Sequence, residues 1–282
     1  MENNSLWMDV IKRILKSKVA TIGLIIIAIL IITAIFAPYI APYGPTDGEL
    51  VNRVQAPSGQ NLLGTDSQGR DILSRIIYGS RISIEIGLIS VGIALVIGTI
   101  LGAVSGYYGG IIDIVVMRFV DIMMAFPSVL LAIAIMAVLG PSLDNAMIAI
   151  GIVNIPTFAR IVRSSVLSVK AVEFVEAARA VGASDFRIIF LHILPNCLAP
   201  IIVQSTMSIG SAILEAAGLS FLGLGAQPPA PEWGAMLADA RQFIATAPWV
   251  ALFPGLAIVF TVLGFNLLGD GLRDALDPRL KQ

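Results

Sequence analysis

Long apolar stretches alternate with polar segments along the chain, and six of the apolar stretches are long enough to form transmembrane helices. Crossing a bilayer core of about 30 Å takes about 20 helical residues at about 1.5 Å each. The predicted spans are residues 19–37, 84–104, 122–139, 145–161, 198–219 and 249–268. The fourth is short and contains Asn154 and Pro156, although a membrane helix tolerates proline where its neighbours satisfy the freed carbonyl. The pattern predicts an all-α membrane protein with six transmembrane helices.

Lysine and arginine are distributed unequally between the two sides that six crossings define. With the N-terminus in the cytoplasm, all but five of the 18 basic residues fall in cytoplasmic segments. The exceptions are Arg53, Arg70, Arg75, Arg81 and Arg241. The positive-inside rule therefore predicts that both termini are cytoplasmic. Residues 38–83 and 220–248 are then external, and because both are rich in proline and glycine we expect irregular, turn-rich structure there.

Composition agrees with a membrane protein and argues against several other classes. Hydrophobic residues make up 57% of the chain and charged residues 13%, which is about half the charged fraction of a soluble domain. A net charge of −1 argues against a nucleic-acid partner, because such proteins carry clustered basic surface. The single Cys197 permits no internal disulfide, and the single His192 cannot build a multi-histidine metal site by itself. We expect membrane lipid as surroundings, and neither a cofactor nor a bound metal.

Sequence motifs of nucleotide hydrolysis and of common catalytic sites are absent from the chain. No glycine is followed by lysine, so the phosphate-binding loop GxxxxGK[ST] does not occur. There is also no nucleophile elbow and no HExxH pair. We therefore predict no catalytic residues and no ATP hydrolysis by this chain.

A glycine stripe marks the second predicted span. Gly98, Gly102, Gly106 and Gly110 follow one another at four-residue spacing, which places them on one helical face. Membrane helices associate closely where small residues line the contact. The stripe predicts a helix-packing face rather than a substrate site.

The segment between the fourth and fifth spans begins with a short amphipathic helical pattern. The positions on its apolar face are Phe174, Ala177, Ala178 and Val181. Gly182 follows directly and can end this helix in the left-handed cap conformation, which glycine adopts at little cost. The pattern predicts a sharp bend at Gly182.

A second amphipathic pattern follows the bend. Ser184 can cap the second helix, and Asp185 lies near its positive end. The apolar positions of this helix are Phe186, Ile189, Phe190 and Ile193. Pro195 disfavours helical geometry at Leu194, so we expect the helix to end there. Periodicity alone leaves two interpretations open, namely a segment that folds against its own bundle and one that docks on a partner.

The order Glu176-Ala177-Ala178, Gly182 and Leu194-Pro195 resembles the EAA loop of the permease subunits of ABC importers. His192 stands where the broad family pattern has Ile, and the ending His192 to Asn196 is similar to the peptide and nickel branch. In that family the loop forms a coupling helix that docks on an ATPase subunit. The resemblance implies a coupling segment formed by Phe174, Glu176, Ala177, Ala178, Gly182, Ser184, Asp185, Phe186, Phe190, Leu194 and Pro195.

Residues 63–83, 218–241 and 266–280 also resemble the "C" permeases of dipeptide, oligopeptide or nickel importers. The resemblance implies a type I importer fold in the plasma (inner) membrane of a prokaryote. It also implies four further subunits besides this chain: a paralogous permease, two cytoplasmic ATPase subunits and an external substrate-binding protein. Short peptides are the expected solute. Nickel or another small solute remains an alternative, as does an ion-coupled secondary transporter, which would need no cytoplasmic docking loop.

On this basis we divide the chain into three parts. Residues 1–81 hold the cytoplasmic N-terminus, the first transmembrane helix and an external segment, residues 82–271 form a permease core of five transmembrane helices, and residues 272–282 form a cytoplasmic tail. No substrate-binding residue is predicted. Glu215, near the external end of the fifth span, is either functional or paired with an arginine of an external segment.

Other polar residues are expected to have local roles. Asp113, Arg118 and Asp121 flank the third span at its internal end, and we expect them to form local pairs. His192 is expected to pack or to form hydrogen bonds rather than to bind a metal. The methionines are expected to fill the core or face lipid.

Overall fold

The structure is a computed structural model and describes residues 13–276. Lys12, residues 277–280 of the C-terminal motif and Lys281 lie outside the described residues. The longer helices are α2 (Lys18–Ile35), α4 (Ile72–Tyr108), α5 (Gly110–Met124), α6 (Ser128–Leu139), α7 (Leu143–Lys170), α10 (Leu198–Phe221) and α12 (Trp249–Leu276). The shorter helices are α3 (Ala37–Ile40), α8 (Glu173–Ala180), α9 (Asp185–Arg187) and α11 (Trp233–Ala240). The predicted all-α fold is confirmed.

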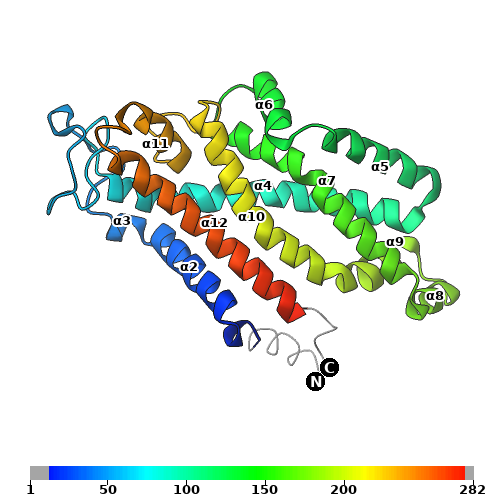
Figure 1. The fold of residues 1–282 in the computed structure, drawn as a ribbon. Helices are drawn as coiled ribbons and strands as arrows, with labels where there is room; N and C mark the ends of the chain where they lie inside the picture. Colours follow the sequence, from blue (N-terminus) through cyan, green and yellow to red (C-terminus); the bar gives the residue numbers. More distant parts are fainter. Residues whose placement is uncertain (1–12, 277–282) are drawn as a thin grey trace.

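The helices form an elongated bundle (Figure 1). α2 packs along α12 on one flank, and α7 packs along α4. Residues 41–71 and α11 gather at one end of the bundle, and we call this group the loop cap. α8 and α9 lie at the opposite end, within a stretch of residues 171–197 that we call the α8–α9 segment.

Five stretches of the described residues are long and apolar enough to cross a membrane, or up to six if the bent pair of α5 and α6 counts as one span. Most are longer than the sequence predicts. α4 has 37 residues and therefore extends about 55 Å, well beyond a bilayer core of about 30 Å. α7 continues past residue 161 to Lys170.

The third predicted span, residues 122–139, is wrong as a continuous helix. α5 ends at Met124, α6 begins at Ser128, and the two helices meet at 92°. Pro127 stands at the break. Proline has no backbone N–H and disfavours helical geometry in the residue before it, which interrupts the helix. Hydropathy does not register this change of direction, because the residues on both sides of the break are apolar.

The glycine stripe is confirmed as a packing face for three of its four positions. Gly98, Gly102 and Gly106 lie against α7, and a Cβ atom added at Gly102 would stand 2.5 Å from the carbonyl oxygen of Ala159. Side chains at these positions would therefore separate the two backbones. Gly110 does not belong to this face, because α4 ends at Tyr108 and nothing lies within 4 Å of the corresponding Cβ position.

A buried charge cluster organises the loop cap. Arg70 Nε and Arg75 Nε lie 2.6 and 3.4 Å from Asp66 Oδ2, and all three side chains are buried. The Arg75 guanidinium also donates to the carbonyl oxygens of Pro45 and Ala230, at 2.9 and 3.2 Å. These bonds tie the first loop of the cap to the segment that leads into α11.

The expectation of irregular structure over residues 220–248 is wrong where α11 forms. The Glu232 carboxylate caps this helix by accepting from two backbone N–H groups of its first turn, at 2.9 and 2.7 Å. Burial raises the pKa of this carboxyl, while the hydrogen bonds that it accepts act in the opposite direction. Trp233 is buried and donates its Nε1–H to the Ile76 carbonyl at 3.2 Å. A proline-rich sequence thus still contains a helix with a definite place in the core.

Two of the predicted local charge pairs link α5 to α7. Arg163 Nε lies 2.5 Å from Asp113 Oδ1, and Arg160 Nη2 lies 2.6 Å from Asp121 Oδ1. Both aspartates thus form the pairs expected of them. Arg118 makes no ion pair within residues 13–276.

Candidate functional site

The bend of the α8–α9 segment has the geometry that the sequence predicts. α8 ends at Ala180, and Gly182 has a φ of +80°, in the left-handed region. Its N–H donates to the Arg179 carbonyl at 3.0 Å, and the N–H of Ala183 donates to the Ala178 carbonyl at 3.1 Å. These bonds satisfy carbonyl groups that a helix end leaves free. The predicted left-handed helix end at Gly182 is therefore confirmed.

The burial of α8 differs from its predicted apolar face. Val175 is the buried residue of this helix, whereas Phe174 is exposed and Ala178 is half-buried. Val181 lies beyond the last helical turn and is exposed. Glu176 and Ala177 are also exposed. The short helix thus packs on the bundle mainly through Val175, and most of the predicted apolar face is exposed.

The second half of the segment runs into α10 without the expected break. The Ser184 hydroxyl accepts from the Arg187 N–H at 3.4 Å, which confirms the predicted cap. Leu194 is half-buried and helical, with φ −57° and ψ −39°, so the expected end at this residue is wrong. A π-turn at Ile188–Ile193 gives way to a 3-10 turn at Leu194–Cys197. Pro195 is exposed and lies in the first turn of this 3-10 element. Proline is tolerated there because the backbone N–H groups of a first helical turn have no partner within the helix.

Two apolar groups face opposite ways along this second half. Ile188, Ile189 and Ile193 are buried in a core cluster that also contains Val175. Phe186 and Phe190 are 70% and 49% exposed, and their ring centroids lie 4.4 Å apart. We call these two residues the aromatic pair. The predicted apolar face is therefore split between an inner aliphatic side and an outer aromatic side.

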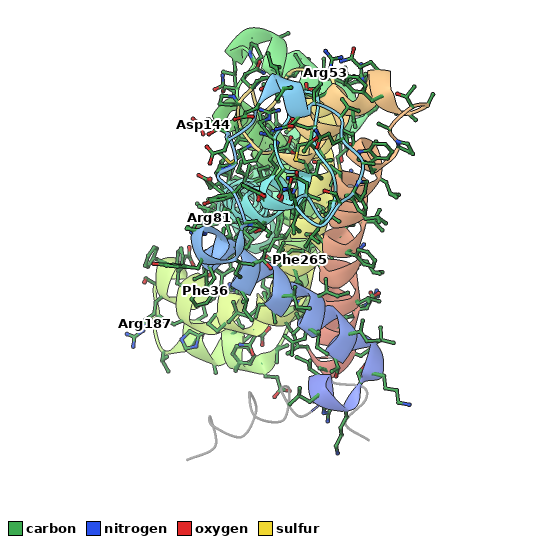
Figure 2. The ribbon with its side chains drawn as sticks, turned by 90° about the vertical axis from the view of Figure 1, so that its left-hand side faces the viewer. Phe36, Arg53, Arg81, Asp144, Arg187 and Phe265 are labelled. Carbon is green, nitrogen blue, oxygen red and sulfur yellow. The ribbon has the colours of Figure 1, made fainter. Side chains whose placement is uncertain are left out.

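Tyr107, the penultimate residue of α4, holds the segment in place. Its hydroxyl donates to Asp185 Oδ1 at 2.6 Å, and Arg179 Nη2 donates to the same hydroxyl at 3.4 Å. Lys170 donates its Nζ–H to the Tyr107 carbonyl. Sequence reasoning missed Tyr107, because a tyrosine at the end of an apolar span carries no signal of a distant partner. Figure 2 shows the neighbouring Arg187 pointing away from the bundle.

A polar cavity lies among α7, α10 and the junction of α5 and α6. Its volume is about 400 Å³. The polar side chains that line it are Ser128, Asn154, Thr157, Gln204, Ser208, Ser211 and Glu215. Asn154 Nδ2 donates to Glu215 Oε2 at 3.0 Å. Of the two alternatives left open for Glu215, the pairing with an external arginine is not found within residues 13–276, where its partner is this amide on α7. The sequence does carry a signal for the cavity, since the polar positions of α10 recur at helical spacing.

His192 lies on the α8–α9 segment away from this cavity. It is half-buried, and its backbone carbonyl accepts a hydrogen bond from Asn196 Nδ2 at 2.7 Å. Within residues 13–276, no three His, Cys, Asp or Glu side chains are grouped so that they could hold a metal ion.

Nearly the whole chain is similar to known transport permeases. Residues 98–282 match the binding-protein-dependent transport system inner membrane component, and residues 5–62 match the N-terminal TM domain of oligopeptide transport permease C. The chain is 58% identical to the dipeptide transport system permease protein DppC of Alkalihalophilus pseudofirmus, over 98% of this chain and 90% of that protein. It is 49% identical to the glutathione transport system permease protein GsiD of Pectobacterium atrosepticum, over 98% of this chain and 92% of that protein.

The fold has a counterpart among solved structures. An inward-facing structure of the MetNI methionine ABC transporter superposes with a TM-score of 0.60 and 20% identity, over 73% of this chain and 98% of that one. The helical bundle and the matched families together define a membrane-spanning transport component. The chain belongs to the binding-protein-dependent transport system inner membrane components, the permease subunits of ABC importers, and within them to the dipeptide and oligopeptide branch.

Proposed function

We propose that this chain is the permease subunit of an ATP-driven importer of short peptides. The observation that carries the proposal is its close similarity, over almost its full length, to permeases named for dipeptide, di/tripeptide and glutathione transport. Glutathione is itself a tripeptide, so these names share a substrate class, and they favour peptides over nickel. A paralogous permease completes the path, and an external binding protein delivers the peptide.

The α8–α9 segment is the proposed docking site for a cytoplasmic ATPase subunit. The aromatic pair supports this role, because two large apolar side chains that remain exposed in the isolated chain are typical of a surface that a partner covers. Tyr107 and Val175 fasten the segment to the bundle, so a movement of the docked ATPase reaches α4. The docking residues are those that the resemblance implies, with Phe186 and Phe190 as the main contacts.

The proposed orientation places the α8–α9 segment and both termini in the cytoplasm of a prokaryote, with the loop cap outside. Cysteines introduced at the exposed residues Gln68 and Gln227 should react with a membrane-impermeant thiol reagent in intact cells, and one at Ser184 should not. The native Cys197 is buried and gives little background. Labelling of Ser184→Cys from outside would contradict the orientation.

Reconstitution tests the function as a whole. The chain, its paired permease, the ATPase subunits and the binding protein are assembled in proteoliposomes, and uptake of labelled dialanine is measured with ATP enclosed on the ATPase side. We expect uptake to need every subunit, and the permease chain alone to hydrolyse no ATP. ATP turnover that persists without the ATPase subunits would contradict the proposal, as would uptake driven by an ion gradient alone.

A further inference from the structure

A stripe of polar side chains runs along one face of α10. Gln204, Ser208, Ser211 and Glu215 follow at intervals of four, three and four residues, which keeps them on one face of the helix. Gln204 Nε2 donates to Ser208 Oγ at 2.9 Å, and all four side chains line the same cavity. The stripe spans about 16 Å of helix, roughly half of a bilayer core.

Glu215 ends the stripe, and its carboxylate has no cationic partner within the part of the chain that the structure describes. The Asn154 amide donates to it, and this amide also donates to the Ile150 carbonyl at 2.9 Å. A carboxylate can accept about four hydrogen bonds, so most of its capacity remains open toward the cavity. An ionisable side chain at membrane depth is costly and typically serves a ligand or an ion.

The lining of the cavity indicates which ligand fits. The carboxylate suits a primary ammonium group, and the hydroxyls of Thr157 and Ser211, which line the same cavity, offer further acceptors. Met123 and Phe126 provide an apolar wall on the side of the α5–α6 junction. The volume of about 400 Å³ falls in the range of small-molecule sites, about 300–1,000 Å³.

We propose that Glu215, oriented by Asn154, contacts the α-ammonium group of the peptide as it passes through the membrane. The inference rests on the proposed function, since it assigns a contact to the peptide of that import reaction. Short peptides differ in their side chains but share the ammonium group. A site that binds this ammonium group, and in which the peptide side chains contact only Met123 and Phe126, accepts peptides of many sequences.

The charge at the site can be probed without relying on uptake. In the complete transporter, Ser211→Cys places a thiol one helical turn from Glu215, on an exposed residue of the cavity. After correction for reactivity with a free thiol, cationic 2-aminoethyl methanethiosulfonate should label it about fivefold faster or more than neutral methyl methanethiosulfonate, through attraction to the carboxylate. Dialanine should slow the labelling, and N-acetyl-dialanine at the same concentration should not.

The Glu215→Gln variant supplies the decisive contrast, because glutamine keeps the oxygen that accepts from Asn154 and removes the charge. We expect the cationic preference and the protection by dialanine to disappear in Ser211→Cys/Glu215→Gln. Glu85→Gln removes an exposed acid of α4 that does not line the cavity and should leave both unchanged. An equal preference with and without the Glu215 charge would overturn the proposal. So would a lack of preference in Ser211→Cys alone, which is the result expected if a cation of the paired permease neutralises Glu215.

Uptake separates a failure of this inference from a failure of the proposed function. Glu215→Gln should lower dialanine uptake about tenfold, as expected for one lost charge contact. Glu215→Asp should retain part of the uptake, and ATPase co-purification should match wild type in both variants. Wild-type uptake by Glu215→Gln would overturn the inference alone. A wild-type transporter that takes up no dialanine would overturn the proposed function, and with it peptide as the ligand here.

Discussion

The loop cap and the α8–α9 segment lie at opposite ends of the bundle, and they use their most distinctive residues in opposite ways. In the cap, Asp66 and Arg75 are 5% and 2% exposed, although charged side chains prefer water. In the α8–α9 segment, Phe186 and Phe190 face solvent, although aromatic side chains prefer the interior. The loop cap therefore buries charged side chains, whereas the α8–α9 segment exposes aromatic ones.

The difference shows what each set of residues is for. A charge that is buried and paired in the isolated chain already has its partner, so its role is to hold this chain together. The two aromatic side chains that lie together and exposed on the α8–α9 segment instead favour contact with a partner outside the chain. Substitutions in the cap should therefore reduce the stability of the chain itself, and substitutions in the α8–α9 segment should reduce its association with the proposed ATPase.

The largest expected effect is that of Asp66→Ala. The substitution leaves Arg70 and Arg75 buried without their shared carboxylate, which should cost about 3–5 kcal/mol of folding stability. Thermal unfolding of the purified chain in detergent measures this loss. Glu49→Ala removes an exposed acid of the same cap and should change little. Equal melting temperatures for both variants would contradict a stabilising role for the cluster.

The double substitution Phe186→Ala/Phe190→Ala should act on association alone. Removing two aromatic contacts from an interface should weaken ATPase binding by about 2–4 kcal/mol. Thermal unfolding of the chain should stay near wild type, because both rings are exposed in it. Binding of the ATPase to the permease pair is measured by titration in nanodiscs, with Val51→Ala in the loop cap as an exposed apolar control. Unchanged affinity would remove the aromatic pair from the proposed interface.

Gly182→Val should uncouple transport from ATP hydrolysis, because it strains the bend between α8 and α9. Valine at a φ of +80° costs about 1–2 kcal/mol. Nothing lies within 4 Å of the added Cβ, so the strain comes from the backbone alone. Gly182→Ala should be milder, and Gly59→Val, in open space without a positive φ, serves as control. ATPase co-purification and dialanine uptake are compared at matched membrane levels, and normal uptake by Gly182→Val would exclude a role for the bend.

Tyr107→Phe should have the smallest effect. It removes the hydroxyl that donates to Asp185, at a cost of about 1 kcal/mol. Hydrogen–deuterium exchange should then quicken in the α8–α9 segment and stay constant in the loop cap. Tyr108→Phe, next to it but without a hydroxyl hydrogen bond among the described residues, should leave both ends unchanged. Equal exchange in the two variants would show that the hydroxyl does not anchor the segment.

The sequence predicts local features of this fold better than distant ones. Most spans are recognisable because their apolar runs are long, and the bend at Gly182 is recognisable because glycine and the Ser184 cap act on their own neighbours. The break at Pro127 was missed, since a change of helix direction leaves hydropathy unaltered. The contacts of Tyr107 and Asn154 were missed for another reason. Their partners, Asp185 and Glu215, are far away in sequence and are brought close only by packing.

The division at residues 81 and 271 and the docking roles of the α8–α9 residues stay predictions. The first depends on where the membrane boundaries fall, and the second on a partner surface. Neither is a property of the isolated chain.

α4 connects the two ends that behave so differently. It carries Arg75 in its first turn and Tyr107 in its last, and its glycine face presses backbone against backbone along α7. Two helices packed in this way bend less readily than a single helix, so we expect them to move as one rigid unit. Over a length of about 55 Å, a tilt of about 5° displaces the far tip by about 5 Å. A tilt of this helix would therefore change the position of the loop cap relative to the α8–α9 segment.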